Sequence, residues 1–229
     1  MSTFVLIPGA GGAASFWSRV TPLLEAGGHH EAIAVDLPGA DESAGLPEYT
    51  DLVLAAMGDR DDVVLVAQSM GGFTAPMVCA RGPVRLLLLL NAMIPRPGET
   101  PGEWWGNTGS EEARIAAARD GGYSAELDLE TTFLHDLPAE ALASGELEGR
   151  PEADIAFGQP CAIDRWPDVP TGVISGRDDR LFPLEFQRRV AKGRLGLEVD
   201  VVPGGHLAAL SYPAALADQI LQTSTRTGS

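Results

Sequence analysis

The chain has 229 residues and a mass of 24.0 kDa, enough for one α/β domain with a full core and too little for two large domains. Its 32 acidic residues outnumber its 16 basic residues, and the resulting net charge of −16 repels phosphate backbones and anionic lipid headgroups. We therefore expect neither nucleic acid nor a membrane as a partner. The single lysine, Lys192, fits neither a phosphate-binding loop nor a Tyr-x-x-x-Lys pair.

The cysteines and the amino-terminal residues carry no signal for export. Cys79 and Cys161 belong to no disulfide or metal-binding pattern. The first residues run directly into an apolar segment without the basic stretch of a signal peptide, and the longest apolar run, Leu86 to Leu90, is too short to cross a bilayer. These features predict a cytoplasmic protein with no bound metal, either a monomer or a homodimer.

Short apolar segments alternate with longer amphipathic ones, which is the pattern of a parallel sheet built from βαβ units. The third and fourth apolar segments are apolar throughout, which predicts central strands covered on both faces. In chain order, strands are predicted at Phe4–Ile7, Ala32–Val35, Val63–Ala67, Arg85–Leu90, Gly172–Ile174 and Glu198–Val202. Helices are predicted at Ser15–Leu24, Leu52–Met57, Met70–Ala80, Leu184–Ala191 and Pro213–Thr223.

The alternation breaks off between Pro95 and Trp166, where segments rich in Gly, Pro, Glu and Ala replace it. Two helices are predicted there, at Ser110–Asp120 and Leu137–Leu142. We therefore expect an α/β core formed by residues 1–94 and 167–229, and a helical insertion formed by residues 95–166.

The segment Ala67-Gln68-Ser69-Met70-Gly71-Gly72 follows a predicted strand and opens a predicted helix. This is the setting of a nucleophile elbow, in which small residues two positions before and after the serine let strand and helix pack around a strained turn. Ala67 stands where glycine is more usual, and it is still small. A plain Ser-Gly turn that ends a buried strand is the alternative interpretation, because similar strings arise by chance.

A serine hydroxyl is a weak nucleophile unless a base and an orienting acid accompany it. Asp178 and Asp179 follow the predicted strand Gly172–Ile174, at the sheet edge where α/β folds collect functional groups. Asp179 is preferred because it completes a G-x-x-D-x-x-x-P string, while a solvated charge cluster is the alternative for both. His206 ends a Pro-Gly-Gly turn after the last strand and is the best placed of the four histidines to act as the base.

Acyl transfer also needs N–H donors for the developing oxyanion, and fixed backbone amides serve best. The amides of Met70, directly after the serine, and of Ala10, in the glycine-rich loop after the first strand, are the candidates. The same loop fits the G-x-G-x-x-A fingerprint of dinucleotide-binding proteins, with Asp36 about 20 residues further on. That alternative explains neither the elbow nor the late aspartate and histidine, so we expect no cofactor.

Together these motifs resemble those of the α/β-hydrolase superfamily over nearly the whole chain, from Phe4 to Ile220. Three narrower strings, Asp-Leu-Pro-Gly-Ala-Asp from Asp36, Asn-Ala-Met-Ile-Pro from Asn91 and Phe-Leu-His-Asp-Leu-Pro from Phe133, resemble the branch of plant methyl-ester hydrolases and hydroxynitrile lyases with their bacterial relatives. The resemblance implies an α/β-hydrolase fold: a mostly parallel central sheet with helices on both faces, and the insertion as a small helical cap.

Two departures from these relatives bear on the reaction. Relatives commonly have histidine where Pro8 stands, in the loop that would supply the second oxyanion donor. The hydroxynitrile lyases of this branch carry threonine at the position of Gly9 and lysine directly after the catalytic histidine, where this chain has Leu207. The resemblance therefore favours hydrolysis over the release of cyanide.

The resulting hypothesis is a serine hydrolase in which His206, oriented by Asp179, activates Ser69 to cleave a small to medium, largely apolar ester or lactone through an acyl-enzyme. The alternatives are a cofactor-free lyase or natural-product tailoring enzyme on the same fold, and a non-catalytic homologue that binds a small molecule. The aromatic residues of the insertion fit a substrate pocket and the insertion's own core equally well. Candidate pocket residues are Gly9, Trp104, Trp105, Phe133, Phe157 and Leu207.

Overall fold

A six-stranded parallel sheet forms the centre of the computed structural model, which describes residues 2–143 and 149–226. The strand order is β2-β1-β3-β4-β5-β6, and the two central strands are buried throughout, as their uninterrupted apolar sequence predicted. All six predicted strands are present to within one or two residues at each end. The strands are β1 (Thr3–Ile7), β2 (Glu31–Ala34), β3 (Val63–Gln68), β4 (Leu86–Leu90), β5 (Thr171–Gly176) and β6 (Val199–Val202).

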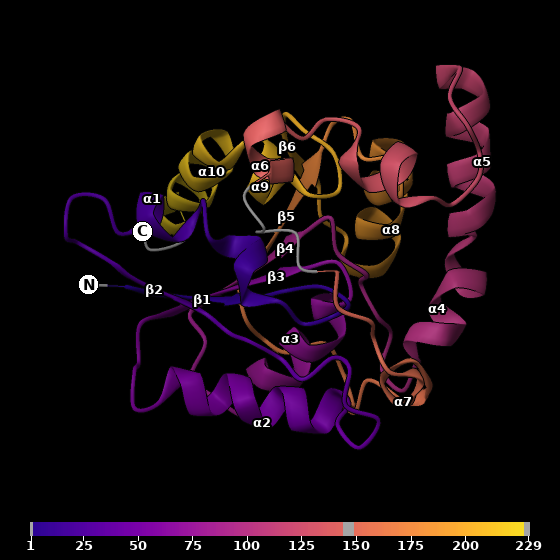
Figure 1. The fold of residues 1–229 in the computed structure, drawn as a ribbon. Helices are drawn as coiled ribbons and strands as arrows, with labels where there is room; N and C mark the ends of the chain where they lie inside the picture. Colours follow the sequence, from indigo (N-terminus) through magenta and orange to yellow (C-terminus); the bar gives the residue numbers. More distant parts are fainter. Residues whose placement is uncertain (1, 144–148, 227–229) are drawn as a thin grey trace.

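Helices cover both faces of this sheet: Figure 1 shows α2 and α3 on one side and α1 and α10 on the other. Side chains alternate along each strand, so the core has two layers. Val5 and Leu65 pack with α2, α3 and α8, whereas Leu6 and Val66 pack with α1, α9 and α10. These helices are α1 (Thr21–Leu24), α2 (Leu46–Met57), α3 (Gly71–Cys79), α8 (Leu184–Leu195), α9 (Ala208–Ser211) and α10 (Pro213–Arg226).

Several helices of the core differ from their predicted bounds: α8 and α10 continue to Leu195 and Arg226, beyond the predicted ends, and α9 was not predicted. The first two helices differ most. The predicted helix Ser15–Leu24 is divided into a 3-10 helix, Ala14–Trp17, and α1. Pro22 lies in the first turn of α1, and a proline has no N–H with which to continue a preceding helix. Helix α2 begins earlier than predicted, at Leu46, where Glu48 accepts a hydrogen bond from the Gly45 amide at 2.9 Å and closes the first turn.

The insertion, residues 95–166, lies between β4 and β5, and Figure 1 shows its helices α4 and α5 along one side of the molecule. The two predicted helices correspond to α5 and α6, while α4 and α7 were not predicted. A capping box between Thr100 and Glu103, a signal present in the sequence, opens α4. The insertion contains α4 (Pro101–Thr108), α5 (Ser110–Gly121), the π-helix Glu130–Leu134, α6 (Ala139–Ala143) and α7 (Asp154–Gly158).

Across residues 2–143 and 149–226, the longest apolar helical stretches fall short of what a membrane crossing requires.

Candidate active site

Ser69, Asp179 and His206 meet at the carboxyl edge of the sheet. The Nε2 atom of His206 lies 2.9 Å from Ser69 Oγ, and its Nδ1 atom lies 2.8 Å from Asp179 Oδ2. All three side chains are buried. Because Nδ1 faces a carboxylate, it is the nitrogen suited to carry the ring proton, which leaves the Nε2 lone pair directed at the serine hydroxyl. This chain of contacts is the arrangement that makes a serine nucleophilic.

Ser69 occupies a strained turn between β3 and α3. Its φ of 51° lies in the left-handed region, which a non-glycine residue adopts only when the surrounding structure demands it. The Ser69 amide donates to the Leu90 carbonyl at 3.2 Å, and the Met93 amide donates to the Ser69 carbonyl at 2.9 Å. A Cβ atom on Gly72 would lie 2.1 Å from the Met93 carbonyl oxygen, so only glycine allows this approach.

Asp179 is the member of the Asp178–Asp179 pair that contacts the histidine. Its Oδ1 atom accepts hydrogen bonds from the amides of Leu181 and Phe182 at 2.8 and 2.9 Å, which directs Oδ2 to the imidazole. The Asp178 side chain is half exposed, and its Oδ1 atom lies 3.6 Å from the Nε atom of Arg177. The two neighbouring carboxylates therefore have separate surroundings, one inside the site and one at the surface.

The loop that carries His206 is held by Asn91, which was not among the predicted site residues. Its Nδ2 atom donates to the carbonyls of Gly205 and His206, and its Oδ1 atom accepts from the Gly176 amide at 2.7 Å. With a φ of 44°, Asn91 is also in the left-handed region. It thereby connects the ends of β4 and β5 to the histidine loop. Its place directly after a predicted central strand was the available signal.

Ala10 and Met70 line the same cavity as Ser69. Neither amide donates a hydrogen bond to any other residue that the structure describes. These two backbone N–H groups therefore remain the candidates for an oxyanion hole. Asp36, the residue that fits a dinucleotide fingerprint, instead accepts from the Ala14 amide at 3.0 Å and pairs with Arg150.

Glu152, which was not among the predicted site residues, supports the loop that contains Ala10. Its Oε2 atom accepts the Gly11 amide at 2.6 Å, and its Oε1 atom accepts the Tyr49 hydroxyl at 2.7 Å. Burial raises the pKa of Glu152 above its usual value, and the two hydrogen bonds only partly offset that rise. No sequence signal marks it, because its partner Gly11 is 141 residues away in an unrelated motif.

A cavity of about 450 Å³ opens above Ser69 and His206, within the usual size range of small-molecule sites. Its wall is mostly apolar, which suits a largely apolar ligand. Leu127 and Leu129, both more than half exposed, stand at its rim. Five of the six residues predicted for the pocket line it, namely Gly9, Trp105, Phe133, Phe157 and Leu207.

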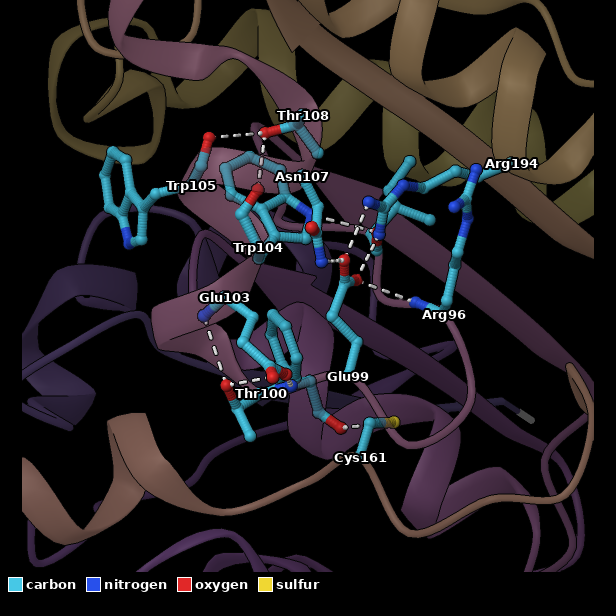
Figure 2. Close-up of polar contacts among 12 residues, drawn as sticks. Arg96, Glu99, Thr100, Glu103, Trp104, Trp105, Asn107, Thr108, Cys161 and Arg194 are labelled. Carbon is cyan, nitrogen blue, oxygen red and sulfur yellow. Dashed lines mark hydrogen bonds and ion pairs between the residues drawn. The ribbon is translucent and has the colours of Figure 1, made fainter.

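The sixth, Trp104, does not line the cavity. Trp104 is fully buried against Phe182 and Phe186, and its indole N–H donates to the Ile94 carbonyl at 3.0 Å. Figure 2 shows the rings of Trp104 and Trp105 pointing in different directions from the same helix. Adjacent residues of a helix lie about 100° apart around its axis, so one indole enters the core and the other the cavity.

A family model described as the alpha/beta hydrolase family matches residues 4–219. The chain belongs to this family. The similar proteins include polyneuridine aldehyde esterase from Rauvolfia serpentina, which is 24% identical across 96% of this chain and 95% of its own length. Methylesterase 1 of Arabidopsis thaliana is 25% identical, across 97% of this chain and 96% of its own. The alpha-hydroxynitrile lyase of Arabidopsis thaliana is 24% identical across 97% of this chain and 96% of its own length.

The crystal structure of polyneuridine aldehyde esterase shares the fold of this chain. It superposes with a TM-score of 0.79 at 20% sequence identity and covers 98% of this chain and 99% of its own. The predicted α/β-hydrolase fold is therefore confirmed, and so is the predicted resemblance to methylesterases and hydroxynitrile lyases.

Proposed function

We propose that this protein hydrolyses a small to medium, largely apolar carboxylic ester or lactone, with Ser69 as the nucleophile, His206 as the base and Asp179 as the orienting acid. The observation that carries the proposal is the 2.9 Å contact between Ser69 Oγ and His206 Nε2 beside an apolar cavity of about 450 Å³. The esterases and methylesterases among the similar proteins support it.

In the proposed reaction, His206 accepts the Ser69 proton as Oγ attacks the ester carbonyl carbon. The Ala10 and Met70 amides hold the oxyanion, and the imidazolium then gives its proton to the departing alcohol. Water, deprotonated by His206, attacks the acyl group on Ser69, and the carboxylic acid leaves with the serine restored. The insertion acts as a cap, because it contributes Trp105, Phe133 and Phe157 to the wall of the cavity.

The test combines intact-mass analysis after exposure to a fluorophosphonate with hydrolysis of a short-chain p-nitrophenyl ester. A single adduct is expected on the unaltered protein and none on Ser69→Ala, whose turnover should fall by at least about 10³-fold. Circular dichroism of both proteins controls for folding. A folded, unaltered protein that gives neither adduct nor turnover would contradict the hydrolase mechanism and point to ligand binding without catalysis.

The lyase alternative is supported by the related alpha-hydroxynitrile lyase. Two observations weigh against it. Leu207 follows the histidine, so no cation stands there for departing cyanide. A Cβ atom on Gly9 would lie 2.8 Å from the Ser69 Cβ, which leaves no room for a threonine in this backbone position. Cleavage of a cyanohydrin that depends on Ser69 while the protein forms no acyl-enzyme would favour the lyase.

A further inference from the structure

One segment of the insertion, Thr131–Asp136, reaches back to the loop that carries His206. The Asp136 Oδ2 atom accepts a hydrogen bond from the Gly205 amide at 2.6 Å. Its Oδ1 atom is buried and has no hydrogen-bond partner among the described residues. Gly205 directly precedes the histidine, so this contact lies one residue from the proposed base.

The Gly205 backbone is held from two sides. Its N–H is bound by Asp136, and its carbonyl accepts from Asn91 Nδ2 at 3.0 Å. A Cβ atom at Gly205 would lie 3.1 Å from Asp136 Oδ1 and 2.8 Å from the His135 ring, so the absence of a side chain permits the close approach. Asn91 comes from the end of β4, whereas Asp136 comes from the insertion.

The same segment contacts the loop of the orienting acid. The His135 Nε2 atom lies 3.1 Å from the Asp178 carbonyl oxygen, and Arg180 donates to the Thr131 carbonyl at 3.0 Å. The Phe133 ring packs edge-on against the His206 imidazole, with 5.5 Å between the ring centres. Thr131–Asp136 therefore touches the residues on both sides of Asp179 as well as the histidine.

We propose that Asp136 is a positioning residue of the active site: its carboxylate holds the Gly205 amide and thereby keeps the His206 ring aimed at Ser69. This inference rests on the proposed hydrolase function. Without Asp136, the Gly205 amide loses its hydrogen-bond acceptor, and only the hydrogen bonds of Asn91 and Gln68 to the carbonyls of Gly205 and His206 remain. The imidazole is then less firmly aimed at the serine hydroxyl. A displacement of about 1 Å in a reacting group can cost about 10²-fold in rate.

The experiment compares Asp136→Ala with Asp136→Asn on a p-nitrophenyl ester. Asp136→Ala should lower kcat by about 10- to 100-fold with little change in KM, because the cavity wall is unaltered. Asp136→Asn should stay within about threefold of the unaltered protein, because the amide oxygen still accepts the Gly205 N–H. The control is Asp120→Ala, which removes an exposed carboxylate of the same insertion that pairs with Arg119, and its kcat should be unchanged.

A second measurement separates this proposal from the proposed function. Hydrogen exchange of the Gly205 amide should be faster in Asp136→Ala than in the unaltered protein or in Asp120→Ala, and this readout needs no turnover. A kcat of Asp136→Ala within about twofold of the unaltered protein, an equal loss in Asp136→Asn, or unchanged Gly205 exchange would overturn the proposal. Absence of turnover in the unaltered protein, together with the expected change in exchange, would refute the hydrolase function and leave the Asp136 contact established.

Discussion

Among the described residues, Ser69 and Asn91 are the non-glycine residues with positive φ, at 51° and 44°. They follow the two central strands, which are hydrogen-bonded neighbours. Each conformation costs of order 1–3 kcal/mol and persists because the surrounding contacts require it. At Ser69 the strained turn presents the hydroxyl to His206, and at Asn91 it directs the amide to the histidine loop. Among the described non-glycine residues, the left-handed conformation is therefore confined to two residues of the candidate site.

Gly72→Ala tests the close packing beneath the elbow. The added Cβ would lie 2.1 Å from the Met93 carbonyl oxygen, a backbone atom with little freedom to move, so the free energy of unfolding should fall by about 1–3 kcal/mol. The control is Gly106→Ala in α4, where no atom lies within 4 Å of the new Cβ and unfolding free energy should rise by up to about 1 kcal/mol. Urea denaturation followed by circular dichroism measures both. Equal stability of the two variants would contradict this account.

At the level of elements, the insertion is connected to the core by polar contacts near both of its ends. Near its start, Glu99 forms a buried ion pair with Arg194 of α8 (Figure 2), and the exposed fractions of the two side chains are 4% and 6%. Near its end, Glu152 holds the Gly11 amide. Between them, Asp136 holds Gly205. The insertion is thus attached to the glycine-rich loop that contains Ala10 and to the loop that carries His206, so its placement and the geometry of the site are coupled.

Glu99→Gln should lower the free energy of unfolding by about 3 kcal/mol at neutral pH, because it leaves the Arg194 guanidinium buried without a counter-charge. Burial raises the pKa of Glu99, but hydrogen bonds from Arg194, Arg96 and Asn107 outweigh it and bring the pKa below its ordinary value of 4.5. Such a group stabilises the fold above its unfolded pKa, and this contribution is lost as the pH falls through the folded pKa. The difference between the two proteins should therefore shrink on acidification.

Denaturation curves between neutral pH and about pH 3 provide the measurement. Glu185→Gln is the control. The Glu185 side chain pairs with Arg188 on the same helix, α8, and is 80% exposed, so this substitution should change the free energy of unfolding by under about 1 kcal/mol. If the stability difference between Glu99→Gln and the unaltered protein instead grows toward acid pH, the ionised form of Glu99 does not stabilise the fold.

The whole molecule combines a net charge of −16 with a mostly apolar cavity. Arg150 lines that cavity, and its guanidinium pairs with Asp36 at 2.8 Å. The net charge of the whole molecule lowers the concentration of anions around it, which favours neutral esters over anionic ones.

If the hydrolase function holds, an ester with a free carboxylate should be cleaved with a kcat/KM about tenfold below that of a neutral ester of the same length at low salt. The gap should narrow as ionic strength rises to about 0.15 M, where the screening length is about 8 Å, while the neutral ester serves as the control and should change little. A carboxylate ester that is preferred at low salt would show that Arg150, rather than the net charge, governs selection.

Local patterns were sufficient to predict the six strands, the central place of β3 and β4 and the elbow. Each depends on residues close in sequence: a run of apolar side chains for a buried strand, and small residues around a serine for the turn. The meeting of Ser69, Asp179 and His206 could also be predicted. Each residue follows a predicted strand, and the carboxyl ends of parallel strands lie at one edge of the sheet. The motif strings indicated the family because each of them is also a short run of neighbouring residues.

Contacts between distant segments decided the rest. Trp104 and Trp105 are neighbours with the same chemistry, and only the packing of α4 against Phe182 and Phe186 places one in the core and the other in the cavity. Asp136 and Glu152 contact amides 69 and 141 residues away, and no local pattern records such a pairing. A side chain's partner depends on where the folded chain brings its segment, so these residues acquire their roles only when the insertion packs against the sheet.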